Sequence, residues 1–279
     1  MLVPWLALPG ATSILAEWSA AAGIDLLALG THADATTIRD TAVAQPLLTA
    51  AALLSLAALD VTPHVVLGHS VGELAALVAA DVIDPTTAVR LAAERGRAMA
   101  SAAALTPTGM VAVLGGEESA VLTRAVELGL EVATVNVAGQ VVLGGPVAAL
   151  DAFAAQPPAG ARVRRLETAG AFHTKAMAPA VPRLADLVAA IAPRDPRCTV
   201  LANADGAAVT SGRALLDRLV GQLTGPVRFD LCLQAVADLG PSTVIELAPG
   251  GTLIALAKRA LPGVALTALR TPDDLPVLV

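Results

Sequence analysis

The residues of this sequence best suited to covalent chemistry lie in the stretch Gly-His-Ser-Val-Gly at positions 68–72. An apolar run at 65–67 precedes it and an Ala- and Leu-rich run at 74–80 follows it, the strand–turn–helix setting in which such a serine acts as a nucleophile. Ser70 would then stand at a helix N-terminus, where the backbone N–H of Val71 can stabilise an oxyanion. We expect both glycines to be needed for the angles and close approach of the turn. The alternative is an ordinary helix start with a capping serine, because this short pattern is common by chance.

A serine nucleophile needs a base, and the chain has four histidines. His173 is the candidate, because it lies in a loop of small residues at 169–174 that leaves room for a substrate. His69 adjoins the serine, but a neighbour on a sharp turn points elsewhere, so we expect it to pack against or line the pocket. His32 and His64 are expected to be structural or exposed. The loop alone leaves a structural role for His173 open.

The composition narrows the class of protein. The 279 residues are 55% hydrophobic and 2% aromatic, without tyrosine, which predicts a core of Ala, Val and Leu packed through many small contacts. The net charge is −6 and there is no long basic run, which argues against nucleic-acid binding.

The number of cysteines, the spacing of histidines and the hydropathy pattern bear on disulfides, metal binding and location. Cys198 and Cys232 are too few for a disulfide framework, and the histidines lack metal-ligand spacing, so we expect no metal. The N-terminus does not resemble a signal peptide. Residues 42–59 come closest to a membrane span, but polar residues and a proline interrupt them, so a buried helix is expected. A cytoplasmic protein with no membrane contact is predicted.

Short apolar runs alternate with helical stretches, which predicts an α/β fold with a mainly parallel sheet, similar to the α/β-hydrolases. The middle differs, because its pattern is strand, helix, strand, strand, helix, strand, the ferredoxin-like order. We therefore expect a ferredoxin-like subdomain at 108–168, inserted into a large body formed by residues 1–107 and 169–279. The predicted helices of the body span 12–22, 46–59, 74–80, 85–102, 176–190, 214–222 and 252–260; its strands span 64–67, 199–202, 243–246 and 265–269.

Several segments, in this order, together resemble one family: the malonyl-CoA:acyl carrier protein transacylases and the acyltransferase domains of fatty-acid and polyketide synthases. The stretch Gly-His-Ser-Val-Gly-Glu at 68–73 is similar to the family's serine motif. The other similar segments are Thr-Ala-Val-Ala-Gln-Pro-Leu (41–47), Glu-Arg-Gly-Arg-Ala-Met (94–99), Val-Asn-Val-Ala-Gly-Gln-Val-Val (135–142), Gly-Ala-Phe-His (170–173), Gln-Leu-Thr-Gly-Pro-Val-Arg-Phe (222–229) and Ile-Glu-Leu-Ala-Pro-Gly-Gly (245–251).

The resemblance implies a role for each matching residue. Ser70 would be the acylated nucleophile and His173 its base, oriented by a backbone carbonyl near Gln222 rather than by a carboxylate. Arg95 would hold the free carboxylate of a malonyl group, which suits the planar fork of a guanidinium. Three further residues, Gln45, Asn136 and Gln222, would line the pocket or support the Ser–His pair. Phe172 and Val71 would favour malonyl over the bulkier methylmalonyl group.

The reaction implied by the resemblance is ping-pong acyl transfer from malonyl-CoA, through an acyl-serine, to the phosphopantetheine thiol of acyl carrier protein, without a bound cofactor. Because such carriers are acidic, a local basic patch is expected, with Arg162, Arg164, Arg165 and Lys175 as candidates. An ordinary solvated surface would explain these residues equally well. A serine thioesterase or hydrolase, and a non-catalytic copy that binds the carrier, are the alternative functions.

The chain departs from the family pattern at its start. Family members have a strand and then a Gly-Gln-Gly-x-Gln loop, whose second Gln supplies an oxyanion N–H, and that loop is absent before residue 12. We expect residues 1–3 to be the remaining part of that first strand. The oxyanion assignment then depends on Val71 alone, and loss of one such donor typically costs about 10²–10³ in rate.

Overall fold

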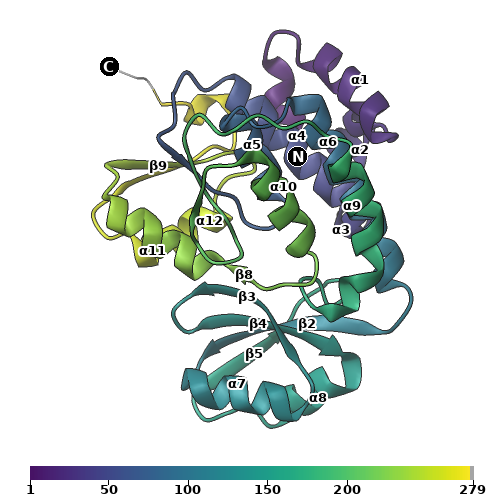
Figure 1. Ribbon diagram of the computed structural model, residues 1–279, viewed down its shortest axis with the longest axis vertical. Coiled ribbons are helices and arrows are strands. Elements are labelled where there is room, and N and C mark those ends of the chain that lie inside the picture. Colours follow the sequence, from purple (N-terminus) through teal and green to yellow (C-terminus); the bar gives the residue numbers. More distant parts are fainter. Residues whose placement is uncertain (277–279) are drawn as a thin grey trace.

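A computed structural model describes residues 1–276 and shows a large α/β body above a smaller sheet domain (Figure 1). The N-terminal half of the body is helical, and its longest helices, α4 and α6, lie against each other. Asp84 accepts the N–H of Thr87 and so caps α6, as the Asp-Pro pair at 84–85 predicts. The elements of this half are η1 (Val3–Ala7), α1 (Ala11–Ala22), α2 (Leu26–His32), α3 (Ala35–Arg39), α4 (Thr41–Ala57), α5 (Gly72–Ala79) and α6 (Pro85–Ala103).

The strands of the body form two small sheets instead of one continuous sheet. The first has the order β1-β6-β7, and the second pairs β9 with β10. β1 and β6 are parallel, as are β9 and β10, whereas β7 runs antiparallel to β6. The α/β class is confirmed. Two of these three strand pairs are parallel, as the prediction of a mainly parallel sheet requires. The strands are β1 (Val65–Val66), β6 (Thr199–Leu201), β7 (Ala208–Val209), β9 (Thr243–Glu246) and β10 (Ala265–Ala268).

The smaller domain has the ferredoxin-like order of elements. Its strands are arranged β5-β2-β4-β3, all antiparallel, with α7 and α8 on one face (Figure 1). A fifth strand from the body, β8 (Val227–Arg228), extends the sheet by pairing parallel to β3. The boundaries 108 and 168 remain a prediction. The elements are β2 (Thr108–Gly115), α7 (Glu118–Glu127), β3 (Glu131–Val137), β4 (Gln140–Pro146), α8 (Val147–Ala155) and β5 (Ala161–Arg165).

The remaining helices belong to the C-terminal half of the body. Residues 176–190, expected as one helix, form a 3-10 segment followed by an α-helix, because Pro179 and Pro182 remove two backbone donors from its start. The helix at 229–239 was not predicted. These elements are η2 (Lys175–Ala180), α9 (Val181–Ala189), α10 (Gly212–Gly221), α11 (Phe229–Leu239), α12 (Thr252–Ala260) and η3 (Pro272–Asp274).

Two expectations about the N-terminal half are wrong. Residues 1–3 are no strand: a 3-10 helix begins at Val3, and the N-terminal ammonium of Met1 and the backbone N–H of Leu2 both donate to the Gly30 carbonyl. The helix expected from residue 46 begins at Thr41, because the side chain of Asp40 caps it and Pro46 lies inside it.

The main core lies among the helices of the body and is built chiefly from Ala, Leu and Val, as the composition predicts. Most of α4, which forms the greater part of the stretch that comes closest to a membrane span, is buried there. Within residues 1–276 no single helix is long and apolar enough to cross a membrane, although the pair α1 and α2, bent by 110°, passes by length and composition when taken together.

Candidate active site

Ser70 lies on a sharp turn between β1 and α5, with the left-handed φ of 54°. This conformation is uncommon for a residue with a side chain and typical of strained functional positions. A Cβ at Gly68 would overlap the backbone of Gly72 and Glu73, so position 68 requires glycine. The expectation for the second glycine is wrong, because Gly72 has a negative φ and open space where a Cβ would be. Within residues 1–276 the Val71 N–H at the start of α5 donates to no acceptor.

His173 is within hydrogen-bonding distance of the serine. The Ser70 Oγ lies 2.7 Å from its Nε2, and its Nδ1 lies 2.8 Å from the backbone carbonyl of Gln222. Because a carbonyl only accepts, Nδ1 carries the proton and Nε2 is free to accept from the serine hydroxyl. Burial, and then the nearby charge of Arg95, lower the pKa of His173 to about 3. The imidazole is therefore a neutral base at physiological pH.

A buried guanidinium completes the centre. Arg95 on α6 is 1% exposed and donates to the Gln45 Oε1 (2.6 Å), the Gln222 Oε1 (2.7 Å) and the Ser70 Oγ (3.2 Å). Burial lowers its pKa to about 10, so it remains charged at neutral pH. Its Nε–H is buried and has no acceptor within residues 1–276. Arg95 is thus a cation with an unused donor beside the serine.

His69 and Asn136 connect the body to the smaller domain. The His69 Nε2 lies 2.9 Å from the Asn136 Oδ1 on β3, and its ring packs against Phe229 at a centroid distance of 5.2 Å. Burial lowers the pKa of His69, which keeps it neutral. His69 therefore packs against Phe229 and lines the pocket. Its ring bonds to Asn136 and not to Ser70, so His173 is the base for the serine.

These groups surround one cavity of about 390 Å³ between the body and the smaller domain. Met110 and Val142 of the smaller domain form an apolar part of its wall, and Phe172 packs against the small cluster that they form with Ala133. Arg39 and Glu167 also line the cavity and form an exposed ion pair of 2.7 Å. Every residue that the sequence predicted for the site lines this cavity, except Gln222. The side chain of Gln222 lies outside the lining and accepts a hydrogen bond from Arg95.

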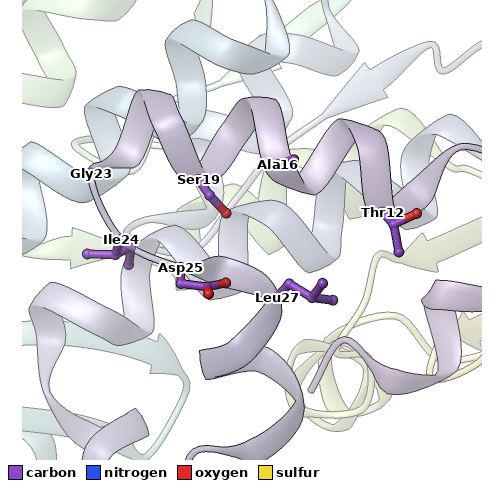
Figure 2. A pocket seen from close by; sticks show the side chains of 7 residues that line it. All are labelled: Thr12, Ala16, Ser19, Gly23, Ile24, Asp25 and Leu27. Carbon is purple, nitrogen blue, oxygen red and sulfur yellow. The ribbon is translucent and has the colours of Figure 1, made fainter.

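A second cavity, of about 530 Å³, lies in the corner between α1 and α2 (Figure 2). Two of its polar side chains, Ser19 and Asp25, already have local partners. The Ser19 Oγ donates to the Leu15 carbonyl and accepts from the Leu26 N–H, and the Asp25 carboxylate accepts from the Ala28 N–H. None of its lining residues is a histidine, lysine or arginine, so we assign it no chemistry.

Two residues of the site, Glu73 and Asn203, were missed by the sequence analysis. The Asn203 Oδ1 accepts the Ser70 N–H at 2.8 Å, and Glu73 accepts the Asn203 N–H at 2.7 Å. Both had a signal in the sequence. Glu73 ends the Gly-His-Ser-Val-Gly-Glu stretch, and Asn203 follows the strand β6, which pairs parallel to β1 just before Ser70. Carboxyl ends of parallel strands meet at one edge, where sites form.

The candidate basic patch is partly neutralised. Arg165 pairs with Asp151, and the carboxylate of Glu131 lies near the backbone N–H of Lys175. Arg162 and Arg164 are exposed on β5. Within residues 1–276, no group of three His, Cys, Asp or Glu side chains could hold a metal ion.

The site lies between an α/β body and a ferredoxin-like domain. It combines a strained serine, a neutral histidine oriented by a carbonyl, and a buried guanidinium. Together these features define an acyl-transferring serine enzyme. The comparisons agree: the acyl transferase domain family matches residues 15–268, and the chain belongs to this family.

Proteins similar to this chain include malonyl CoA-acyl carrier protein transacylases. That of Mycolicibacterium smegmatis is 49% identical, over 99% of this chain and 98% of its own length. The crystal structure of MCAT from Mycobacterium tuberculosis is 50% identical with a TM-score of 0.95, covering 98% of this chain and 92% of that one. A malonyl-transacylase in complex with its type II PKS acyl-carrier protein is 30% identical with a TM-score of 0.89, covering 98% and 92%.

Proposed function

We propose that this protein transfers a malonyl group from malonyl-CoA, through an ester on Ser70, to the phosphopantetheine thiol of acyl carrier protein. The observation that carries the proposal is the unused Nε–H of the buried Arg95, in the same cavity as Ser70 and His173. A buried cation with a free donor favours a substrate that brings an anion, and guanidinium pairs with carboxylate bidentately. The names of the similar proteins and the complex with a carrier protein support the same reaction.

The first half-reaction follows from these contacts. The Ser70 Oγ attacks the thioester carbonyl while its proton moves to the His173 Nε2, 2.7 Å away. The Val71 N–H, at the start of α5, is the oxyanion donor that this chain offers. Collapse of the intermediate breaks the C–S bond, and the leaving coenzyme A sulfur takes the proton from His173.

The second half-reaction reverses these steps with another thiol. His173 takes the proton of the phosphopantetheine thiol, whose sulfur attacks the malonyl ester, and the proton returns to the Ser70 Oγ as the ester bond breaks. Phe172 packs in the cavity wall, and we assign it, with Val71, the preference for malonyl over methylmalonyl. One methyl group gives about 1–3 kcal/mol of discrimination. No step requires a cofactor, and we place the reaction in the cytoplasm, in fatty-acid or polyketide synthesis.

One observation separates this proposal from a serine hydrolase of the α/β-hydrolase type. The His173 Nδ1 is bonded to the Gln222 carbonyl rather than to a carboxylate, so the Ser–Asp/Glu–His triad is absent from the described residues. The third hypothesis, a non-catalytic copy that binds the carrier, is motivated by the loop that is missing before residue 12. Two observations favour catalysis over it: Ser70 and His173 have the geometry that acyl transfer needs, and the Val71 N–H at the start of α5 is available as an oxyanion donor.

The test of the proposed function follows malonyl groups from malonyl-CoA with and without holo acyl carrier protein. We expect malonyl-carrier protein to form, and little free malonate without the carrier. Release of malonate at the same rate with or without the carrier would instead establish a hydrolase. The apo carrier, which lacks the phosphopantetheine thiol, is the matched control and should receive nothing.

A further inference from the structure

A buried carboxylate beside the nucleophile has no role in the steps above. Glu73, in the first turn of α5, is 9% exposed. Its Oε1 accepts the Asn203 N–H at 2.7 Å, and its Oε2 accepts from the Gln222 Nε2 at 2.6 Å. A buried carboxylate costs free energy even when it is hydrogen-bonded, and the positions of its two partners show what it supports.

Asn203 holds the serine turn from both sides. Its Oδ1 accepts the Ser70 N–H at 2.8 Å, and its Nδ2 donates to the Gly68 carbonyl at 2.6 Å. These two bonds span the residue with the left-handed φ. A side chain that keeps Asn203 in place therefore keeps the nucleophile in its strained conformation.

Gln222 connects Glu73 to the other two functional groups. Its Oε1 accepts from the Arg95 guanidinium at 2.7 Å, and its backbone carbonyl lies 2.8 Å from the His173 Nδ1. The Gln222 amide thus lies between Arg95, which can only donate, and the Glu73 carboxylate, which when ionised can only accept. These two ends allow the amide one orientation.

We propose that Glu73 is a positioning residue, whose ionised carboxylate sets the direction of the hydrogen-bond chain from Arg95 through Gln222 and anchors Asn203 behind the Ser70 turn. A neutral acid or an amide at position 73 would carry a hydrogen-bond donor of its own. That donor would face either the Nε2 of Gln222 or the backbone N–H of Asn203, which are also donors. Either Gln222 then turns and loses its bond to Arg95, or Asn203 moves and releases the turn. The proposal deepens the proposed function, on which it rests, by naming what keeps the site in its active arrangement.

Proton uptake by Glu73 falls in the physiological range. Burial raises the pKa of Glu73 to about 7, against the lowering by the Asn203 N–H and the charges of Arg95 and Arg218. The other nearby groups stay in one state around pH 7: the pKa of the Cys232 thiol is raised to about 12, and the pKa values of His69 and His173 are both lowered. The charged and titratable groups that face this region are Arg95 on α6, Arg218 on α10, Cys232 on α11, and His69 and His173 of the site.

The experiment measures the rate at which malonyl-CoA acylates Ser70, by rapid quench and intact mass, from pH 5.5 to 8.5. It uses the wild-type protein, Glu73→Gln, Glu73→Asp and the control Glu246→Gln. Glu246 is a matched control because its carboxylate accepts the N–H groups of Gly251, Leu253 and Ile254, away from the cavity.

In the wild type we expect the rate to fall below pH 7 as Glu73 takes up a proton. Glu73→Gln should be about tenfold slower or more at pH 8, with no fall between pH 8 and pH 6. Glu73→Asp and Glu246→Gln should keep the fall. A wild-type rate without this fall, or a Glu73→Gln protein that keeps it, would overturn the proposal.

A second measurement needs no variant and no acyl transfer. The backbone amide resonance of Asn203, followed by NMR in the wild-type protein, should shift with a midpoint near pH 7, because its acceptor is Glu73. A resonance that stays constant from pH 5.5 to 8.5 overturns the inference, even if Glu73→Gln does not fold. Failure of the wild type to accept malonyl groups would count against the proposed function instead, because the pH dependence of the Asn203 amide resonance does not require acyl transfer.

Discussion

Arg95 is almost fully buried, yet among residues 1–276 it has no direct carboxylate partner. Its bonds go to two neutral glutamines and the serine, and its Nε–H has no acceptor. A buried charge with an unused donor costs free energy unless an anion reaches it. The carboxylate of a malonyl group would supply that anion beside the Ser70 Oγ, and we therefore propose that Arg95 carries the specificity of the site.

The prediction at the residue scale separates charge from shape. Arg95→Met keeps an extended side chain but removes the cation. We expect acylation of Ser70 by malonyl-CoA to slow by about 10²-fold or more, and acylation by acetyl-CoA, which has no free carboxylate, to change by less than about tenfold. Parallel acylation rates with the two thioesters provide the measurement. An equal loss with both would show that Arg95 acts only as a structural support.

At the scale of elements, the serine depends on how closely the turn before α5 approaches the helix. Gly68 lies against the backbone of Gly72 and Glu73, whereas Gly72 has open space around its Cα. The two glycines of one motif therefore have different status: the first is required by contact, and the second is a replaceable residue in the first turn of a helix.

We accordingly expect Gly68→Ala to lower the midpoint of thermal unfolding and to remove acylation of Ser70, because a backbone shift is the only way to make room. Gly72→Ala should keep the acylation rate within about threefold and raise stability by about 0.5–1 kcal/mol, since alanine loses less conformational entropy in a helix. Calorimetry and acylation rates of both variants give the comparison. Loss of activity in Gly72→Ala would refute the distinction.

Element prediction from the sequence succeeded where a local signal was strong. Asp84 and Pro85 mark the start of α6, and the alternation of strands and helices in the middle of the chain gave the ferredoxin-like order. It failed where a proline could begin a helix, lie inside it or interrupt it. Pro46 was taken as a first helical residue but lies inside α4, and Pro179 and Pro182 divide an expected helix in two.

At the scale of the whole molecule, the site is assembled from distant parts of the chain. Motif similarity found Ser70, Arg95 and His173, because each lies in a distinctive segment. It missed Glu73 and Asn203, whose roles come from contacts across about 130 positions. The division of the body into two small sheets also depends on such long-range pairing, which local patterns do not specify.

Burial of the base makes the stability of the fold depend on pH. The folded-state pKa of His173 is lowered from 6.5 to about 3, so between these values the unfolded chain binds more protons and stability falls as the pH drops. The raised pKa of Glu73 acts in the opposite direction between 4.5 and about 7. Comparison with His173→Gln isolates the histidine.

We expect the free energy of unfolding of the wild type, relative to His173→Gln, to fall by about 3 kcal/mol between pH 7 and pH 4. Urea unfolding of both proteins at the two pH values provides the measurement. A constant difference would mean that His173 does not enter the folded protein as a buried neutral imidazole.

Transfer of a malonyl group from malonyl-CoA to Ser70 can be measured by the intact mass of the protein after incubation with malonyl-CoA. Ser70→Ala, treated in the same way, is the control. We expect one malonyl adduct on the wild type, mapped by peptide analysis to Ser70, and none on the variant. A folded wild-type protein without an adduct, or an adduct of equal amount on Ser70→Ala, would contradict this expectation.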